Sequence, residues 1–263
     1  MNIPEIIDHT HAYYCLDCGI CTGSCPVSRT TPDFSPRLMV EKALLDEVEN
    51  PLEDINIWSC LSCGQCSERC PSNIDYPEFV RLVREEAVRQ GKGGVPAHRG
   101  LFQTVMRLQS MDVKQSKTDW AREVGKISET GDTYFFVGCA PFFDVEFHDD
   151  WGLDMMDSPK GVLKLMNAIG IEPVVHDDER CCGHDLLWNG DRANFAKLAQ
   201  KNVDLIRKLG CKRVVFSCPE GFMTFKKYYP EVIGELGFEI VHFYELLANE
   251  ASAGKITFSR TEG

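Results

Sequence analysis

The chain has 263 residues, of which 43% are hydrophobic, and its formal net charge is -12. This length and apolar content predict one or two hydrophobic cores, and two domains are the more usual number. Because the chain is acidic and has no apolar run approaching the roughly 18 residues of a membrane span, we expect neither nucleic-acid binding nor a membrane-spanning segment.

The cysteines need a chemical explanation, because there are 13 of them and they occur in groups. The N-terminal residues 1–14 contain neither the basic stretch nor the apolar stretch of an export signal, so we expect a reducing, cytoplasmic location. In that setting, grouped cysteines favour metal thiolates over disulfides.

Two cysteine quartets of identical spacing lie in the first third of the chain. Each has the pattern C-x2-C-x2-C-x3-C-P. Three thiolates at steps of three can hold three corners of a [4Fe-4S] cube, and in bacterial ferredoxins the fourth corner is filled by the cysteine before the proline of the other quartet. Zinc sites more often take their ligands as two separated pairs. The spacing therefore predicts two [4Fe-4S] clusters, the first on Cys15, Cys18, Cys21 and Cys70 and the second on Cys60, Cys63, Cys66 and Cys25.

The segments between and after the quartets have helical patterns. Ser35 and Pro36 suit an N-cap and a first helical position, and apolar residues follow at helical spacing. Tyr76 and Pro77 precede a second run, over residues 79–88, with a broad apolar side. We therefore predict a helical ferredoxin domain over residues 1–95, which ends in the glycine-rich stretch 90–100.

The first part of the chain resembles a known family. The quartets, the helical insert over residues 35–47 and the phrase Ile57-Trp58-Ser59-Cys60 resemble the C subunit of heterodisulfide reductase. The resemblance spans residues 10–90. It implies a protein that passes electrons one at a time between a flavin-bearing partner and a terminal site.

Residues 96–132 are expected to connect this domain to a second one, with a helix over 101–124. Beyond them, strands are predicted at 133–137, 173–176, 213–217 and 239–243, and helices at 158–169, 191–209 and 220–236. Alternation of this kind predicts an α/β domain with a mainly parallel sheet over residues 133–263. The whole chain is thus expected to be a two-domain α+β protein, with the helical 2[4Fe-4S] ferredoxin domain first.

The cysteines of the second domain follow its predicted strands. Cys139, the pair Cys181-Cys182 and Cys218 each come after one of them. Because ligands gather beyond the carboxyl ends of parallel strands, we expect these thiols to converge on a third centre. Adjacent cysteines can share a site only at an irregular turn, which Gly183 permits.

We interpret three further features of the second domain without assigning metal ligation to them. Cys211 precedes its strand instead of following it, so we predict a buried apolar role. We predict that His184 hydrogen-bonds near the site without binding metal. Residues 144–157 carry six acidic side chains, and we expect an exposed loop there in preference to a site for a hard metal ion.

Residues 133–247 resemble the cysteine-rich CCG domain of the B and D subunits of heterodisulfide reductase, which also occurs in iron–sulfur proteins of systems that oxidise glycolate, lactate and glycerol 3-phosphate. The family pattern of C, CCG and CxxC offers five thiolates to a noncubane cluster that cleaves a disulfide. This chain has one copy, in which Gly221 replaces the last cysteine. The resemblance implies a third iron–sulfur cluster, noncubane or ordinary, with zinc as the less favoured occupant, on Cys139, Cys181, Cys182 and Cys218.

Together these features predict an electron-transfer subunit of a heterodisulfide-reductase-like complex. Flavin is expected only in a partner, because the chain has no G-x-G-x-x-G fingerprint. That partner is a heterodisulfide reductase A-like subunit or another flavoprotein, and further electron-transfer subunits are expected beside it. Two alternatives remain: a catalytic disulfide reductase acting at the CCG centre, and a ferredoxin with a zinc-binding docking domain.

Overall fold

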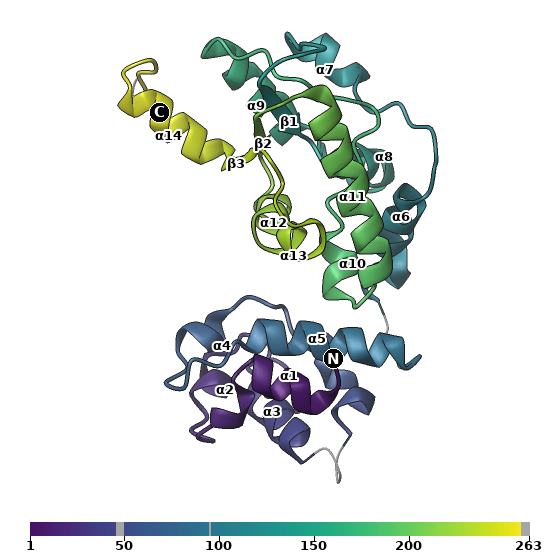
Figure 1. Cartoon of the computed structure of the whole chain (residues 1–263), viewed down its shortest axis with the longest axis vertical. Helices are drawn as coiled ribbons and strands as arrows, with labels where there is room; N and C mark the ends of the chain where they lie inside the picture. The colour runs from purple at the N-terminus through teal and green to yellow at the C-terminus, as the bar shows by residue number, and fades with distance from the viewer. Residues whose placement is uncertain (46–49, 95, 259–263) are drawn as a thin grey trace. The chain divides into compact units, whose positions relative to one another are not determined.

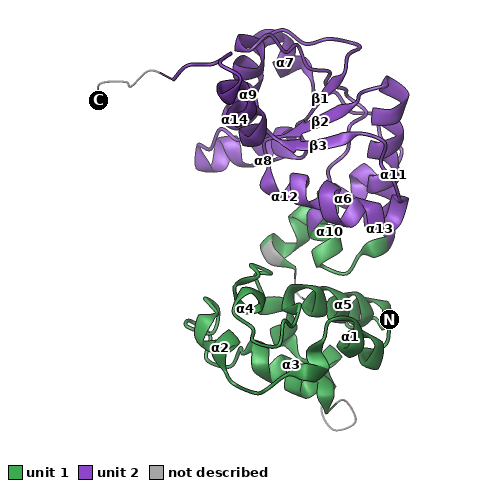
Figure 2. Ribbon diagram, turned by 60° about the vertical axis from the view of Figure 1, so that its left-hand side comes forward, with its two compact units in different colours: residues 1–104, 185–192 green, residues 105–184, 193–263 purple. Residues whose placement is uncertain are grey.

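The computed structural model describes residues 1–45, 50–94 and 96–258. Residues 46 and 47 of the predicted helical insert lie outside the described part. The chain divides into two compact units (Figure 2): unit 1 comprises residues 1–104 and 185–192, and unit 2 comprises residues 105–184 and 193–263. No helix in the described ranges is both long enough and apolar enough to cross a bilayer.

Unit 1 is built from helices and loops (Figure 1). Its α-helices are α1 (Ile3–His9), α2 (Ile20–Ser24), α3 (Pro36–Leu44), α4 (Gln65–Glu68) and α5 (Tyr76–Arg89). Its 3₁₀ helices are η1 (Ala12–Tyr14), η2 (Pro51–Glu53), η3 (Ile55–Ser59) and η4 (Ala97–Gly100). This confirms the helical character expected for the N-terminal part.

The two predicted helices of unit 1 begin where the sequence places them. The Ser35 hydroxyl accepts a hydrogen bond from the Leu38 amide (3.4 Å) at the start of α3, and the Asp75 carboxylate accepts one from the Glu78 amide (3.2 Å) at the start of α5. Such caps satisfy amides that have no partner within the helix. The apolar sides of both helices join α1 in one core, which includes Phe79.

Unit 2 is a parallel sheet with helices around it. The strands are β1 (Thr133–Phe136), β2 (Arg213–Phe216) and β3 (Glu239–His242). The helices are α7 (Asp119–Val124), α8 (Ala140–Trp151), α9 (Asp157–Ala168), α11 (Arg192–Leu209), α12 (Pro219–Met223), the π-helical turn η5 (Thr224–Tyr228), α13 (Tyr229–Ile233) and α14 (Phe243–Ser252). Helices α6 (Leu101–Ser110) and α10 (His184–Trp188) complete the described elements.

The three strands are all parallel, in the order β1-β2-β3. Helices cover both faces of the sheet: α9 and α14 lie on one side and α11 on the other (Figure 2). On the first face, Phe135, Val215 and Val241 pack in one cluster with apolar residues of α7, α9 and α14. Such a doubly covered parallel sheet agrees with the predicted fold class.

Aromatic residues fill the second face. The ring of Phe225 lies 4.8 Å from those of both Phe136 and Phe216, and the tilted ring of Tyr229 lies 3.9 Å from that of Phe225. Phe136 and Phe216 are the last residues of β1 and β2, so this aromatic cluster adjoins the chain segments that lead to Cys139 and Cys218.

One predicted strand is wrong. Residues 173–176 do not form a strand, because only Val174 pairs with β1: its amide donates to the Thr133 carbonyl (2.8 Å), and its carbonyl accepts from the Phe135 amide (2.9 Å). Pro173 has no amide to donate. At His176 the chain already turns, and the Glu179 amide donates to its carbonyl.

Two other expectations need correction. The predicted helix over 101–124 is two helices, α6 and α7, because the segment between them hydrogen-bonds to residues 177–179 through Gln115, Lys117 and Thr118. The expected loop over 144–157 is largely helical, since α8 runs to Trp151 with no residue fully buried. The sequence did not indicate α8, because this segment is rich in acidic residues and has a poor amphipathic pattern.

Candidate functional site

The two quartets form loops of the same backbone conformation. Asp17 and Ser62, which occupy equivalent places, both have φ of 54°, and Gly19 and Gly64 have φ of 75° and 76°. Left-handed residues in such turns gather backbone amides into a concavity that binds anions, as at many iron–sulfur sites. The repeat in sequence is therefore a repeat in structure, and each loop suits a negatively charged sulfide cluster.

A small cavity in unit 1 brings together cysteines of both quartets. It is lined by Cys60, Cys63 and Cys66 of the second quartet and by Cys25 of the first. Cys25 reaches this cavity because it ends α2, which packs against α4 of the second quartet. This lining is the same four-cysteine set that the crossed ligand arrangement requires.

Burial makes these thiols poor thiolates on their own. It raises the pKa of Cys66 to about 12, and the neighbouring Cys60 and Cys21 add to the effect. Burial also raises the pKa of Cys21, which lies near Cys15 and Cys18. Since metal ligation deprotonates thiols outright, a bound cationic core would overcome this cost.

In unit 2, three of the four predicted cysteines line one cavity at the carboxyl ends of the strands. Cys139 lies between β1 and α8, and Cys218 lies between β2 and α12. With Cys182 they line a cavity of about 790 Å³, whose apolar walls include Phe143 and Met155. The structure thus brings Cys139, Cys182 and Cys218 together as predicted.

Cys181 lies behind this cavity. It is fully buried and does not line the cavity, yet it is within hydrogen-bonding reach of Cys139 and Cys182. The contact with Cys139 favours the Cys181 thiolate, but the contact with Cys182 and burial outweigh it and raise the pKa of Cys181 well above its usual value. The turn that separates the two side chains uses Gly183 at φ of 83°, a conformation in which glycine has no steric cost.

Gly221, which stands where the CCG pattern has its last cysteine, also lines the 790 Å³ cavity. A Cβ at this position would lie 3.4 Å from Phe216 Cδ1 and 3.9 Å from Cys218 Cβ, both ordinary contacts. The backbone at residue 221 can therefore present a side chain to the cavity, and glycine leaves that place open.

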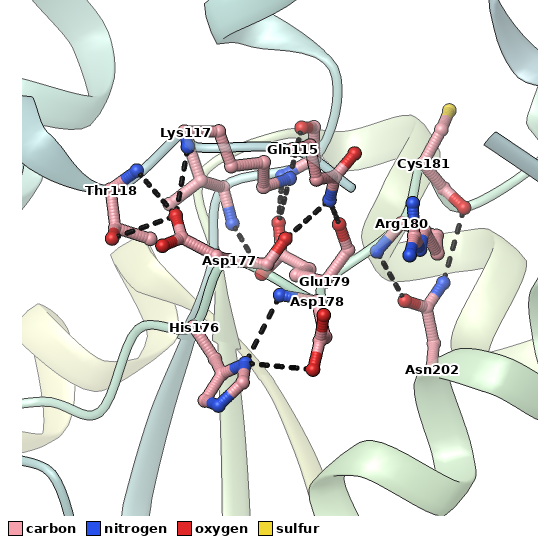
Figure 3. A network of polar contacts seen from close by, with 12 residues as sticks. Gln115, Lys117, Thr118, His176, Asp177, Asp178, Glu179, Arg180, Cys181 and Asn202 are labelled. Carbon is pink, nitrogen blue, oxygen red and sulfur yellow. Dashed lines mark hydrogen bonds and ion pairs between the residues drawn. The ribbon is translucent and has the colours of Figure 1, made fainter. Parts of the chain in front are cut away.

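Buried side chains hold the backbone of the CCG turn. Gln109 Oε1 accepts from the Cys181 amide (2.8 Å), and the Tyr229 hydroxyl donates to the Cys182 carbonyl (3.1 Å). Asn202, on α11, accepts from the Arg180 amide (2.8 Å) and donates to the Cys181 carbonyl (3.1 Å) (Figure 3). We call Gln109, Asn202 and Tyr229 the backbone clamp, and it orients both cysteines through the main chain.

A buried ion pair joins the CCG turn to the Cys139 loop. Lys117 Nζ lies 2.7 Å from Glu179 Oε1, both side chains are almost fully buried, and Lys117 also donates to the Gly138 carbonyl at 2.9 Å (Figure 3). Glu179 in turn accepts hydrogen bonds from the amides of Val137 and Gly138. The pair therefore sets the distance between two of the cysteine-bearing loops.

Replacing Lys117 by methionine is expected to lower the free energy of unfolding of unit 2 by about 3–5 kcal/mol, because the Glu179 carboxylate would stay buried without its counter-ion. Urea unfolding followed by circular dichroism measures the change. Lys126→Met is the matched control: its 3.7 Å pair with Glu172 is exposed, so little change is expected. A loss no larger than the control's would contradict the stabilising role of the pair.

The remaining candidates lie where the sequence predicts or near it. Cys211 is buried, as predicted, and does not line the cavity. His184 Nδ1 lies 3.8 Å from Glu220 Oε2, beside the CPEG turn. Among the described residues, no three His, Cys, Asp or Glu side chains lie close enough to hold a single metal ion.

Sequence reasoning missed the backbone clamp and the Lys117–Glu179 pair. The sequence does indicate a buried role for Asn202, because this residue interrupts an apolar stripe on α11 that runs through Phe195, Leu198 and Ile206. A polar residue on such a stripe needs a buried partner. Nothing in the sequence indicates that Lys117 and Glu179 are buried, because charged residues in loops are normally exposed.

Two family models match the chain. Residues 11–74 match a 4Fe-4S dicluster domain, and residues 133–226 match a cysteine-rich domain, CCG. The first match covers both quartet loops, and the second covers β1, β2 and the three cysteines that line the 790 Å³ cavity.

Curated relatives agree with both domains. The D subunit of the dihydromethanophenazine:CoB–CoM heterodisulfide reductase of Methanosarcina barkeri is 27% identical over 192 residues, which cover 70% of this chain and 44% of the relative. An uncharacterized iron–sulfur protein of Methanococcus maripaludis is 28% identical over 229 residues, 82% of this chain and 44% of the relative. This chain thus spans less than half the length of these relatives.

The N-terminal part has relatives of its own. The C subunit of the H₂:CoB–CoM heterodisulfide,ferredoxin reductase of Methanothermobacter marburgensis is 37% identical over 94 residues, 36% of this chain and 50% of the relative. Homology to such iron–sulfur proteins supports an iron–sulfur electron-transfer role. The chain therefore joins a 4Fe-4S dicluster domain to a CCG cysteine-rich domain and is homologous to the C and D subunits of heterodisulfide reductases.

Proposed function

We propose that this chain is an electron-transfer subunit that relays electrons from a flavoprotein partner, through two [4Fe-4S] clusters, to a third iron–sulfur centre on the CCG domain. The cavity shared by Cys25, Cys60, Cys63 and Cys66 carries the proposal, because it joins the two quartets in the crossed arrangement of a two-cluster ferredoxin. The other four cysteines of the quartets are the proposed ligands of the first cluster: Cys15, Cys18, Cys21 and Cys70. The third centre is assigned to Cys139, Cys181, Cys182 and Cys218.

The side chains around the quartets fit this role. When bound, the clusters supply reversible one-electron chemistry. Within each quartet the second cysteine, Cys18 or Cys63, is exposed, and the exposed Leu16 and Leu61 lie beside them. The buried Cys25 and Cys66 exclude water from the inner side. Each loop therefore combines a protected interior with an apolar edge that a partner can approach.

The partner and the location follow from the same chemistry. The homologous proteins are named as subunits of heterodisulfide reductases, so we propose that this chain also works beside other subunits. We assign flavin to one of them, a heterodisulfide reductase A-like subunit or another flavoprotein. Among the described residues no disulfide joins any of the cysteines, and we propose a reducing, cytoplasmic location, the setting that suits grouped metal thiolates.

Metal analysis of anaerobically purified protein tests the proposal. With two cubanes and a cubane-type third centre, about twelve irons per chain and no zinc are expected. A count of about eight irons with one zinc would instead support a zinc-binding docking domain. Reduction with dithionite should give interacting [4Fe-4S] signals in electron paramagnetic resonance, and their absence from fully loaded protein would reject the two-cluster assignment.

One observation favours a second candidate function, a disulfide reductase acting at the CCG centre. Three cysteines line the cavity of about 790 Å³ together with apolar side chains, a lining that could hold a small disulfide. Turnover of a disulfide by the isolated chain with an artificial electron donor, abolished by Cys182→Ser, would establish this activity. Without such turnover in fully loaded protein, the relay function stands alone.

A further inference from the structure

Arg84, on α5, is a buried cation beside the second cluster set. It is 5% exposed. Its guanidinium donates to three carbonyls: Nε to Ile57 (2.9 Å), Nη2 to Cys60 (2.8 Å) and Nη1 to Trp188 (3.1 Å). Its Cζ also lies 5.5 Å from the centre of the Trp58 ring. These contacts fix the positive charge against the loop that begins with Cys60.

The charge of Arg84 is not neutralised by a carboxylate. Carbonyl oxygens satisfy its hydrogen bonds but carry no net charge, and among the described residues no Asp or Glu forms an ion pair with it. Burying a charge is costly unless an opposite charge lies nearby. An anion beside Cys60 would remove that cost, and a cluster with four thiolate ligands is such an anion.

The first cluster set has a different environment. Arg37, which lies near Cys21 of that set, bonds Asp17 and lies 3.3 Å from Glu41, and its side chain is 29% exposed. Two carboxylates and solvent therefore offset this charge. The two loops share one backbone conformation but differ in the charge placed against them.

We propose that Arg84 raises the reduction potential of the cluster held by Cys25, Cys60, Cys63 and Cys66. This inference rests on the ligand set of the proposed function. Adding an electron makes a cluster more negative, so a nearby fixed cation favours the reduced form. The effect of the cation is strong because burial weakens solvent screening. Arg84 thereby gives the two clusters different reduction potentials, although their loops share one backbone conformation. The electron is expected to reside on the second cluster.

A redox titration of the full chain, monitored by electron paramagnetic resonance, tests this. In Arg84→Gln one of the two [4Fe-4S] midpoints is expected to fall by about 59 mV or more, a tenfold smaller equilibrium constant for a one-electron reduction, while the other stays in place. Arg84→Lys keeps the charge and should retain the original midpoint. Arg37→Gln is the control for a paired, exposed arginine and should move either midpoint by much less.

Each outcome is informative. If both clusters load and Arg84→Gln leaves both midpoints unchanged, or shifts both equally, the inference is wrong although the proposed function survives. If the unaltered chain binds no pair of clusters, the proposed function itself fails. Should Arg84→Gln lose the second cluster while Arg84→Lys keeps it, the need for a cation is supported. Loss in both variants would assign Arg84 a positioning role only and overturn the proposal.

Discussion

Replacing Cys25 by alanine is expected to remove the cluster of the second quartet, although Cys25 belongs to the first. The reason is geometric: Cys25 lines the same cavity as Cys60, Cys63 and Cys66. Iron content should fall by about four per chain, and the magnetic interaction between the two cubanes should disappear. Cys211→Ala is the control, because this buried thiol lies outside both sets and should leave the iron count unchanged.

Double variants show which cluster was lost. If Cys25 and Cys60 ligate one cluster, Cys25→Ala combined with Cys60→Ala loses no more iron than either single change. When Cys25→Ala is combined with Cys15→Ala, the loss of iron should double to about eight per chain, because two clusters are then broken. The reverse pattern, in which Cys25 and Cys15 behave as one unit, would show that each quartet holds its own cluster.

Replacing Gly221 by cysteine is expected to add a fifth thiolate to the third centre. The cavity has room for the side chain, since a Cβ at residue 221 meets nothing closer than 3.4 Å. The electron paramagnetic resonance spectrum of that centre should change. Loss of its iron to a chelator should slow about tenfold or more, the scale on which even the hydrogen-bond partners of ligands act.

A matched control separates ligation from the mere presence of another thiol. Gly161, on α9, has open space around it and does not line the cavity. Gly161→Cys should therefore leave both the spectrum and the rate of iron loss unaltered. If Gly221→Cys behaves in the same way as this control, residue 221 does not face the bound centre.

The sequence predicted those parts of the site that depend on spacing and on topology. Steps of three residues and a repeated proline predict the quartet loops, and parallel strands place Cys139 and Cys218 at one sheet edge, where Cys182 lines the same cavity. The sequence could not show that Cys181 lies behind the cavity, since the direction of adjacent side chains depends on the turn at Gly183. That turn is held by residues far along the chain.

Two of the failed predictions share a physical cause, which is tertiary hydrogen bonding that local pattern does not encode. The expected helix over 101–124 is interrupted where Lys117 and Thr118 bond Asp177 instead of their own helix. The expected strand at 173–176 has one paired residue, because the loop after it serves the Cys139 loop through Glu179. Both departures from pattern thus occur next to the loops that carry the CCG-domain cysteines, where a functional site is expected to override local regularity.

The backbone clamp has a consequence for assembly. Within the CCG turn, Gln109, Asn202 and Tyr229 bond main-chain atoms, so these three contacts do not need the thiols. These contacts can therefore form as the chain folds, before any iron is bound. We expect a chain without the proposed third centre to keep this turn, so that iron and sulfide can be inserted after folding.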